Sequence, residues 1–273
     1  LTLWPDFHNG VAAGLRVGLS EKKDGPEQVK ITRYWIIYNR TAASTAAAAA
    51  VAARNANASG PSNVSTESAI SSHAGVLLAL GLQSHLGVLS KGDICDYLTQ
   101  GHEPTTIAML LGIAASKIGS ADPHMSKTLC LYLPTLLPPR HWDINISPLV
   151  QTAALAGLGL LHAGSGHRLI TEFLLAELSR RPLSDRCDNR ETMALAASWA
   201  LGLVLLGKGG NSSTGTGAAD GGAPGMEGLV DLRIDDRLCH LFTGGRKPEE
   251  SHLFPTVLNP VADGGSRASR ILE

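Results

Sequence analysis

The sequence has few aromatic residues and no marked excess of charge of either sign. Aromatic residues make up 4% of its 273 residues, and 23 basic residues nearly balance 24 acidic ones. A core must therefore be built from Ala, Leu, Val and Gly, whose small side chains allow helices to pack closely. A near-zero net charge provides no field that would collect nucleic acid or an anionic membrane, so the expected partners are other proteins.

The sequence also lacks paired cysteines and long apolar runs. The cysteines form no CxxC pair, which predicts reduced, buried thiols in a nuclear or cytoplasmic protein; they are Cys95, Cys130, Cys187 and Cys239. The longest apolar stretches, residues 153–163 and 194–207, are shorter than the roughly 18 residues that suggest a membrane span. Because the chain begins at Leu1 without a leader, we interpret it as a fragment of a longer protein.

Five segments share a pattern of small residues around a glycine. They are GVAAGLRVG, LLALGLQSHLG, AMLLGIAASKIG, AALAGLGLLHAG and SWALGLVLLG, and their shared glycines are Gly14, Gly81, Gly112, Gly157 and Gly202. In four of them a small residue also stands four positions earlier. Small residues one turn apart let a neighbouring helix approach, which offsets the roughly 1 kcal/mol that a glycine within a helix costs relative to Ala. We therefore expect the five glycines to be repeat-packing positions, and a later glycine to end each helix.

The glycines recur about every 40 residues once an Ala/Ser/Asn-rich tract is set aside, which predicts an all-α solenoid of two-helix repeats. Partner helices are expected over residues 93–99, 123–137, 167–178 and 234–243. Asp122-Pro123 and Ser147-Pro148 each provide a cap residue before a proline at the first helical position. The predicted organisation is a first repeat region at 1–40, an insert at 41–68, central repeats at 69–207, a Gly/Ser-rich loop at 208–228, a last repeat helix at 229–247 and an irregular segment at 248–273.

Three partial motifs resemble catalytic or ligand sites. Residues 202–209, GLVLLGKG, match GxxxxGK of a phosphate-binding loop, but Gly209 stands where Ser or Thr must ligate magnesium. A nucleotide-binding enzyme is therefore the disfavoured alternative. No Cys, Asp or Glu lies at ligand spacing around His162 and His167, and Ser165 fails the GxSxG pattern. The sequence predicts no catalytic residue, cofactor or metal ligand.

One basic cluster falls between two of the predicted repeats. It consists of Arg180, Arg181, Arg186 and Arg190. Such a cluster contributes to solubility or makes a contact with another protein, and the sequence leaves both roles open.

The glycine motif resembles the proteasome/cyclosome repeat, and further segments resemble the largest scaffold subunits of the anaphase-promoting complex (cyclosome). These segments are WPDFHNGVAAGL, WIIYN, DYLTQGHE, LLGIAASKIGSAD and LPTLLPP, and the resemblance extends over about residues 1–246. It is interrupted by the Ala-rich and Gly-rich tracts. The resemblance is more specific than the repeat alone, because the two largest non-ATPase subunits of the proteasome regulatory particle share only the repeat.

The resemblance implies a non-catalytic scaffold in the nucleus and cytoplasm, within a multisubunit ubiquitin ligase of the cell cycle. In that family catalysis belongs to a cullin-like and a RING subunit, so the expected partners are cullin-like and substrate co-receptor subunits, with no nucleic acid and no membrane. A scaffold of the proteasome regulatory particle is the alternative. The repeats of the family curve into a toroid, and about five repeats would form an open arc whose exposed ends let the fragment self-associate.

Overall fold

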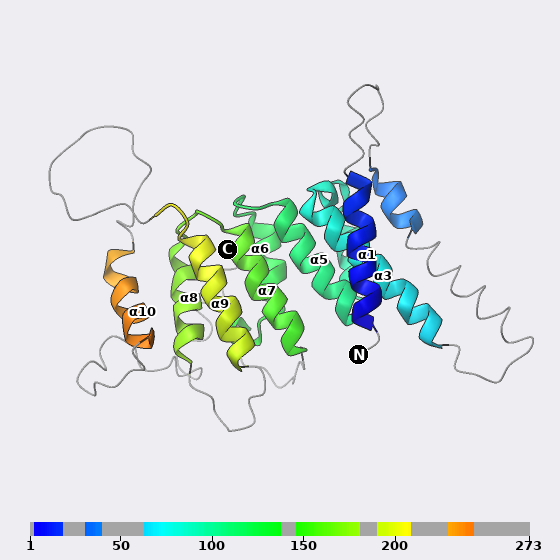
Figure 1. Cartoon of the computed structure of the whole chain (residues 1–273). Coiled ribbons are helices and arrows are strands. Elements are labelled where there is room, and N and C mark those ends of the chain that lie inside the picture. The colour runs from blue at the N-terminus through cyan, green and yellow to red at the C-terminus, as the bar shows by residue number, and fades with distance from the viewer. Residues whose placement is uncertain are drawn as a thin grey trace, which may run out of the picture. The chain divides into compact units, whose positions relative to one another are not determined.

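The computed structural model describes residues 3–18, 31–39, 63–137, 146–180, 190–208 and 229–242 (Figure 1). Over these ranges every regular element is a helix and none is a strand, which confirms the predicted all-α class. The chain divides into two compact units, Leu1–Lys117 and Ile118–Glu273, and each is described by itself.

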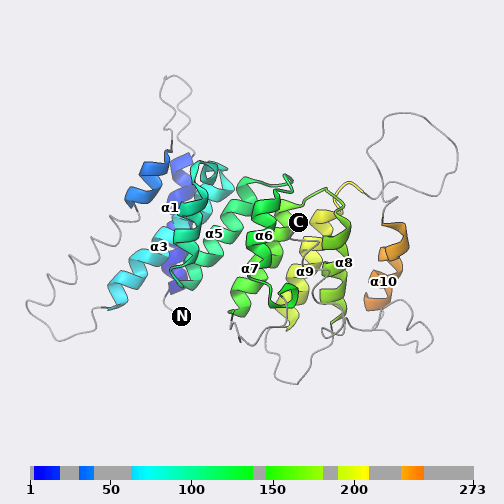
Figure 2. The ribbon, with the colours of Figure 1, turned by 180° about the vertical axis from the view of Figure 1, so that it is seen from behind.

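The first unit is a stack of helices in which the long helices pack in the order of the chain. It contains α1 (Leu3–Gly18), a short helix over residues 33–39, α3 (Asn63–Leu82), α4 (Lys91–Leu98) and α5 (Glu103–Ser116), with a 3₁₀ turn at His85–Val88. The longest helix, α3, packs against both α1 and α5 (Figure 2). The shorter α4 contacts α5.

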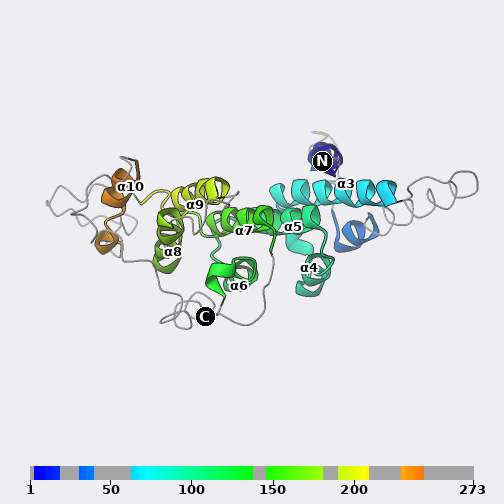
Figure 3. The ribbon, with the colours of Figure 1, turned by 90° about the horizontal axis from the view of Figure 1, so that it is seen from below.

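The second unit has the same plan. It contains α6 (Pro123–Cys130), α7 (Pro148–Leu161), α8 (Arg168–Ser179), α9 (Arg190–Val204) and α10 (Ile234–Phe242), with 3₁₀ turns at Pro134–Leu136 and Val230–Leu232. Figure 3 shows α7 and α9 side by side in one layer, with α6 and α8 on one side of that layer. The pairs α7 with α9, α8 with α9, and α6 with α7 are in contact.

Long and short helices alternate along the chain, as a two-helix repeat requires. We call the glycine-containing helices α1, α3, α5, α7 and α9 the A helices, and their partners the B helices. The A helix α5 buries every residue from Pro104 to Leu110, so it is covered on all sides. The B helix α4 buries only Asp93 and Tyr97. The A helix α5 therefore lies in the interior, whereas the B helix α4 keeps one face in water.

Two predicted boundaries differ from the structure. The partner helix expected over residues 123–137 ends at Cys130, and Pro134 begins a separate 3₁₀ turn, because proline lacks the amide that would continue the helix. The insert expected at 41–68 ends earlier, since α3 already begins at Asn63. Residues 40–62, 209–228 and 243–273 lie outside the described part.

The prediction of buried cysteines is correct for one residue and wrong for two. Cys130 is buried, and burial raises the pKa of its thiol to about 12. Cys95 and Cys239 are exposed, because each lies on the water-facing side of a B helix. Cys187 lies outside the described residues.

Candidate functional site: glycine contacts between repeat helices

In the first unit the A helices meet through residues with little or no side chain. A Cβ built on Gly14 of α1 would lie 2.6 Å from Cβ of Ala79 on α3. A Cβ on Gly81 of α3 would overlap the backbone of Gly112 on α5. The Oγ of Ser116 on α5 also donates a hydrogen bond to the carbonyl oxygen of Gly81, at 3.0 Å. These helices approach to backbone contact, which larger side chains would prevent.

The same contact is present in the second unit. A Cβ on Gly159 of α7 would lie 2.5 Å from Cα of Ala200 on α9. The hydroxyl of Thr152, two turns earlier on α7, donates to the sulfur of Met193 on α9 at 3.5 Å. Gly159 and Ala200 therefore mark the point of closest approach between these two helices.

The five aligned glycines occupy two opposite helix faces, which corrects the single register predicted from the sequence. Gly119, Gly164 and Gly207 all have positive φ angles and end successive repeats at the same point, so they provide an independent alignment. In that alignment Gly202 matches Gly159, and the residue that matches Gly157 is Ala200. Residues two apart on a helix point about 200° apart, so the two sets lie on opposite faces.

We call these two sets the forward position and the back position. The forward positions are Gly14, Gly81, Ala114, Gly159 and Gly202, and the back positions, two residues earlier, are Ala12, Ala79, Gly112, Gly157 and Ala200. In the contacts described above, the forward position of one A helix meets the back position of the next. Gly14, Gly81, Gly112 and Gly157 are buried. Gly202 is exposed, and a Cβ there would meet no atom within 4 Å, so its expected packing contact is not made among the described residues.

Backbone hydrogen bonds join the turn after one A helix to the end of the next. The amide of Gly119 donates to the carbonyl of Leu160 at 3.0 Å, and the amide of Gly164 donates to that of Leu203 at 2.8 Å. Both glycines have φ of +69°, a conformation that glycine adopts at little cost. The turn glycines thus end a helix, as predicted, and also hold the next repeat in register.

His162 is buried at the end of α7, where no function was predicted for it beyond a turn. Its side chain is 3% exposed, and its Nε2 lies 2.8 Å from Oγ of Ser126 on α6. Its ring is 5.2 Å from that of His167, and its Nδ1 has no hydrogen-bond partner among the described residues. Burial, with a smaller contribution from His167, lowers the pKa of His162 to about 4. The hydrogen bond between Ser126 and the neutral imidazole of His162 therefore connects α6 to the end of α7.

A buried carboxylate joins the first two B helices. Asp93 is 7% exposed and accepts hydrogen bonds from Nε and Nη2 of Arg33, at 2.6 and 2.7 Å. It also accepts from the amide and hydroxyl of Ser90, which form a capping box at the start of α4. The hydrogen bonds from Arg33 are the main cause of the low pKa of Asp93, well below its usual range. No sequence pattern predicts this pairing, because the two residues are 60 positions apart.

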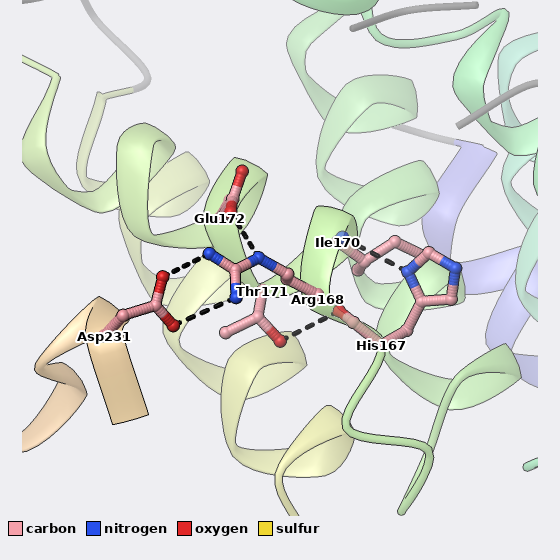
Figure 4. Close-up of polar contacts among 6 residues, drawn as sticks. All are labelled: His167, Arg168, Ile170, Thr171, Glu172 and Asp231. Atoms are coloured by element: carbon pink, nitrogen blue, oxygen red, sulfur yellow. Dashed lines mark hydrogen bonds and ion pairs between the residues drawn. The ribbon is translucent and has the colours of Figure 1, made fainter. Parts of the chain in front are cut away.

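A second ion-pair network connects α8 to the segment before α10 (Figure 4). Arg168 donates from Nε to Glu172 at 3.0 Å, and both of its terminal nitrogens donate to Asp231. His167 caps the same helix through the Ile170 amide. These side chains lie at the start of α8 and make a structural link rather than a set of convergent reactive groups.

Two of the four arginines in the predicted basic cluster make contacts within the chain. Arg180 pairs with the buried carboxylate of Glu177 at 3.3 Å. Arg190 donates to the carbonyls of Glu177 and Leu178, at 2.9 and 3.0 Å, and so binds the free carbonyls at the end of α8. Arg181 and Arg186 lie outside the described residues.

The described residues contain no recognisable metal site, phosphate-binding loop or membrane-spanning helix. In the described ranges no three His, Cys, Asp or Glu side chains form a group that could hold a metal ion. Residues 202–208 form the end of α9 and a turn, whereas a phosphate-binding loop follows a strand and opens a helix. None of the described helices is both long and apolar enough to cross a membrane.

The comparison with known proteins decides the family. The family described as "APC1 fifth domain" matches residues 123–264, and "APC1 fourth domain" matches residues 1–118. The chain belongs to the anaphase-promoting complex subunit 1 family. It is 36% identical over 259 residues to Anaphase-promoting complex subunit 1 of Dictyostelium discoideum, covering 95% of this chain and 9% of the relative.

Other relatives support the same family assignment. Anaphase-promoting complex subunit 1 of Homo sapiens is 35% identical over 249 residues, covering 90% of this chain and 10% of the relative. A relative from Emericella nidulans, named "Negative regulator of mitosis", is 30% identical over 274 residues, covering 98% and 11%. The chain thus spans about a tenth of the length of these relatives, and the fourth-domain and fifth-domain matches meet close to the boundary between the two compact units.

Proposed function

We propose that the chain is a repeat region of a non-catalytic scaffold subunit of the anaphase-promoting complex, a ubiquitin ligase of the cell cycle. The main support for the proposal is that, in a chain of the subunit 1 family, the forward glycine of one A helix contacts the back position of the next A helix. Helices packed at backbone distance make a stiff support, and stacked repeats offer long surfaces rather than deep pockets. The buried polar groups Asp93 and His162 join neighbouring helices, which also fits a supporting role.

Within such a complex, we propose that this region helps to hold a cullin-like subunit and substrate co-receptor subunits, in the nucleus and cytoplasm. The names of its relatives support a place in this complex. The scaffold of the proteasome regulatory particle is less well supported, since both family matches are to subunit 1 domains.

A chimera tests the proposal. The segment of the human relative that aligns with this chain would be replaced by this chain, tagged and purified from human cells. We expect the cullin-like and RING subunits to copurify, together with ubiquitin-ligase activity. A folded chimera that purifies without them, or with the ATPase ring of the proteasome, would contradict the proposal. A matched chimera carrying Gly159→Leu, which disrupts the contact between α7 and α9, should recover less of the complex.

A further inference from the structure

The short helix over residues 33–39 carries two exposed tyrosines on one side. Tyr34 and Tyr38 are one turn apart, so their side chains are neighbours along the helix. Their exposed fractions, 78% and 70%, are among the highest of the large hydrophobic side chains in the described ranges. The whole chain contains four tyrosines, and two of them stand on this one helix. Tyrosine is enriched at protein interfaces, because it presents a large, rigid contact area at little cost in conformational entropy.

The two tyrosines point away from the body of the unit. Ile36, at the middle of the helix, is completely buried. Tyr34 stands two residues before Ile36 and Tyr38 two residues after it, so each side chain is turned about 200° from the buried one. Arg33 lies on the side toward α4, where it binds Asp93. The tyrosine pair therefore faces outward, and not along the direction in which the helices stack.

The equivalent positions of the next B helix carry smaller side chains. Tyr97 is buried on α4, and the residues two before and two after it are Cys95 and Thr99. Both of these residues are exposed. The packing of a B helix therefore does not require an outward pair of tyrosines.

The helix that presents the tyrosines is held in place at several points. Seven residues are too few for a helix that is stable by itself. The amide of Trp35 donates to Oγ1 of Thr32 at 3.3 Å, and Nδ2 of Asn39 donates to the carbonyl of Trp35 at 2.8 Å. Arg33 donates two hydrogen bonds to the buried carboxylate of Asp93. The tyrosine pair is thus positioned before any partner binds, which lowers the entropic cost of binding.

The sequence around this helix is positively charged. Residues 28–66 contain four basic residues and no Asp or Glu, although the whole chain has a net charge of -1. The four are Lys30, Arg33, Arg40 and Arg54. Arg33 is paired with Asp93, and two of the other three, Lys30 and Arg40, directly flank the described helical segment in the sequence. A partner that complements this charge carries Asp or Glu.

We propose that the tyrosine pair is a docking site for an acidic segment of another protein, in which Asp or Glu side chains stand beside apolar ones. The rings would pack on the apolar side chains, and a phenol hydroxyl can donate a hydrogen bond to a carboxylate. The positive charge of residues 28–66 would attract such a segment and speed its association. The inference goes beyond the proposed function and does not depend on it.

Nucleic acid fits this surface less well, although aromatic rings can stack on bases. Binding of a strand needs a groove of positive charge that follows the phosphates. Next to the tyrosines, Arg33 is neutralised by Asp93. The neighbouring α4 presents one exposed cation and one exposed anion, Lys91 and Asp96. The described surface therefore has no row of cations beside the tyrosine pair.

Peptide selection tests this inference. A phage library of random peptides of about 12 residues would be selected on this chain, after removal of phages that bind the Tyr34→Ala/Tyr38→Ala double variant. The affinities of the selected peptides for both proteins would be measured by fluorescence anisotropy, in about 50 and about 300 mM NaCl. The matched control is the Cys95→Ala/Thr99→Ala double variant, which changes the equivalent outward positions of α4.

We expect the selected peptides to carry a net negative charge and to contain apolar residues between their Asp and Glu residues. The tyrosine double variant should bind them at least about tenfold more weakly, and the α4 control should bind them as the unchanged chain does. Binding should also weaken at the higher salt concentration. Circular dichroism should show that both double variants fold, since all four replaced side chains are exposed.

Selected peptides without an excess of acidic residues would overturn the inference. A selection that yields no peptide dependent on the tyrosines would overturn it as well. Single-stranded oligo(dT) that binds this chain more tightly than the peptides do, and loses that binding in the tyrosine double variant, would assign the surface to nucleic acid instead. Should the double variant fail to fold, the single variants Tyr34→Ser and Tyr38→Ser take its place under the same criteria.

Discussion

His162 is buried beside a second histidine, so its charge state is linked to folding. Its pKa falls from an ordinary value of 6.5 to about 4 in the folded chain. The unfolded state therefore binds the proton more tightly, and the free energy of unfolding falls as the pH drops through this window. Above pH 6.5 the contribution of His162 is fully present. Urea denaturation at a series of pH values between 6.5 and about 4 should show this decrease in the free energy of unfolding.

The matched variant is His162→Gln, whose amide can still reach Ser126 but does not titrate. We expect this variant to lose part of the pH dependence between about pH 6.5 and pH 4, although it is less stable at neutral pH. An unchanged slope in the variant would show that another group, such as the half-buried His102, causes the effect.

Asp93 accepts four hydrogen bonds, and its partner Arg33 lies on a different helix. Asp93→Asn removes the charge and two acceptor sites, so we expect a loss of about 1–3 kcal/mol in the free energy of unfolding. The loss should disappear in strong acid, because a carboxyl with a lowered pKa stabilises the fold only above its folded-state pKa.

Asp231→Asn is the control for this prediction. Asp231 also pairs with an arginine, but it is exposed, so water replaces the lost contact and the urea midpoint should shift less. Equal shifts in the two variants would mean that burial does not strengthen the Asp93 pair.

At the scale of the helix, Asp122 provides the start of α6. Its Oδ1 accepts from the amides of His124 and Met125, at 2.9 and 3.4 Å. Asp122→Ala should cost about 1 kcal/mol, measured by chemical denaturation, while Asp122→Asn should retain most of the stability because Asn caps equally well. If Asn is as damaging as Ala, the charge of Asp122 matters more than its capping bonds.

The sequence predicted which segments form helices better than it predicted which way they face. A helices and B helices were found because glycines, prolines and apolar runs are local signals. The faces were assigned wrongly because small residues occur at both the forward and back positions. A shift of two residues between Gly157 and Gly159 leaves the pattern almost unchanged but turns the helix by about 200°. The turn glycines Gly119, Gly164 and Gly207 were the better alignment marks.

Contacts between distant residues were beyond the reach of sequence patterns. Arg33 with Asp93 and Ser126 with His162 are pairs whose members lie on different helices, and each member alone is an ordinary polar residue. In contrast, Arg180 and Arg190 were grouped with Arg181 and Arg186 only because they lie close together in the sequence. The structure assigns both to the end of α8.

At the scale of the whole chain, the Ala-rich tract between the first two repeats offers few groups that could form a core. Residues 43–60 contain no apolar side chain larger than Val51. Replacing them with a short Gly/Ser linker should change the melting temperature by only a few degrees. The free-energy cost of closing a loop changes by only about 0.6 kcal/mol for each doubling of its length. Loss of cooperative unfolding, measured by circular dichroism, would show that the tract is structural.

Within each unit, a forward glycine of one A helix packs on the back face of the next A helix, and α9 has no such neighbour among the described residues. Gly159 and Gly202 occupy equivalent positions on α7 and α9, but only Gly159 contacts a neighbouring helix. The same Gly→Ala substitution at both positions therefore separates the effect of that contact on stability from the effect of helix propensity. At Gly159 a methyl would press on the backbone of Ala200, whereas at Gly202 it would enter open space and improve helix propensity.

Chemical denaturation of Gly159→Ala and Gly202→Ala in this chain is therefore the most direct measurement. We predict a loss of about 1–3 kcal/mol for Gly159→Ala and a gain of up to about 1 kcal/mol for Gly202→Ala. Stabilisation by both substitutions would contradict the glycine contact between α7 and α9, and destabilisation by both would contradict the open face of α9.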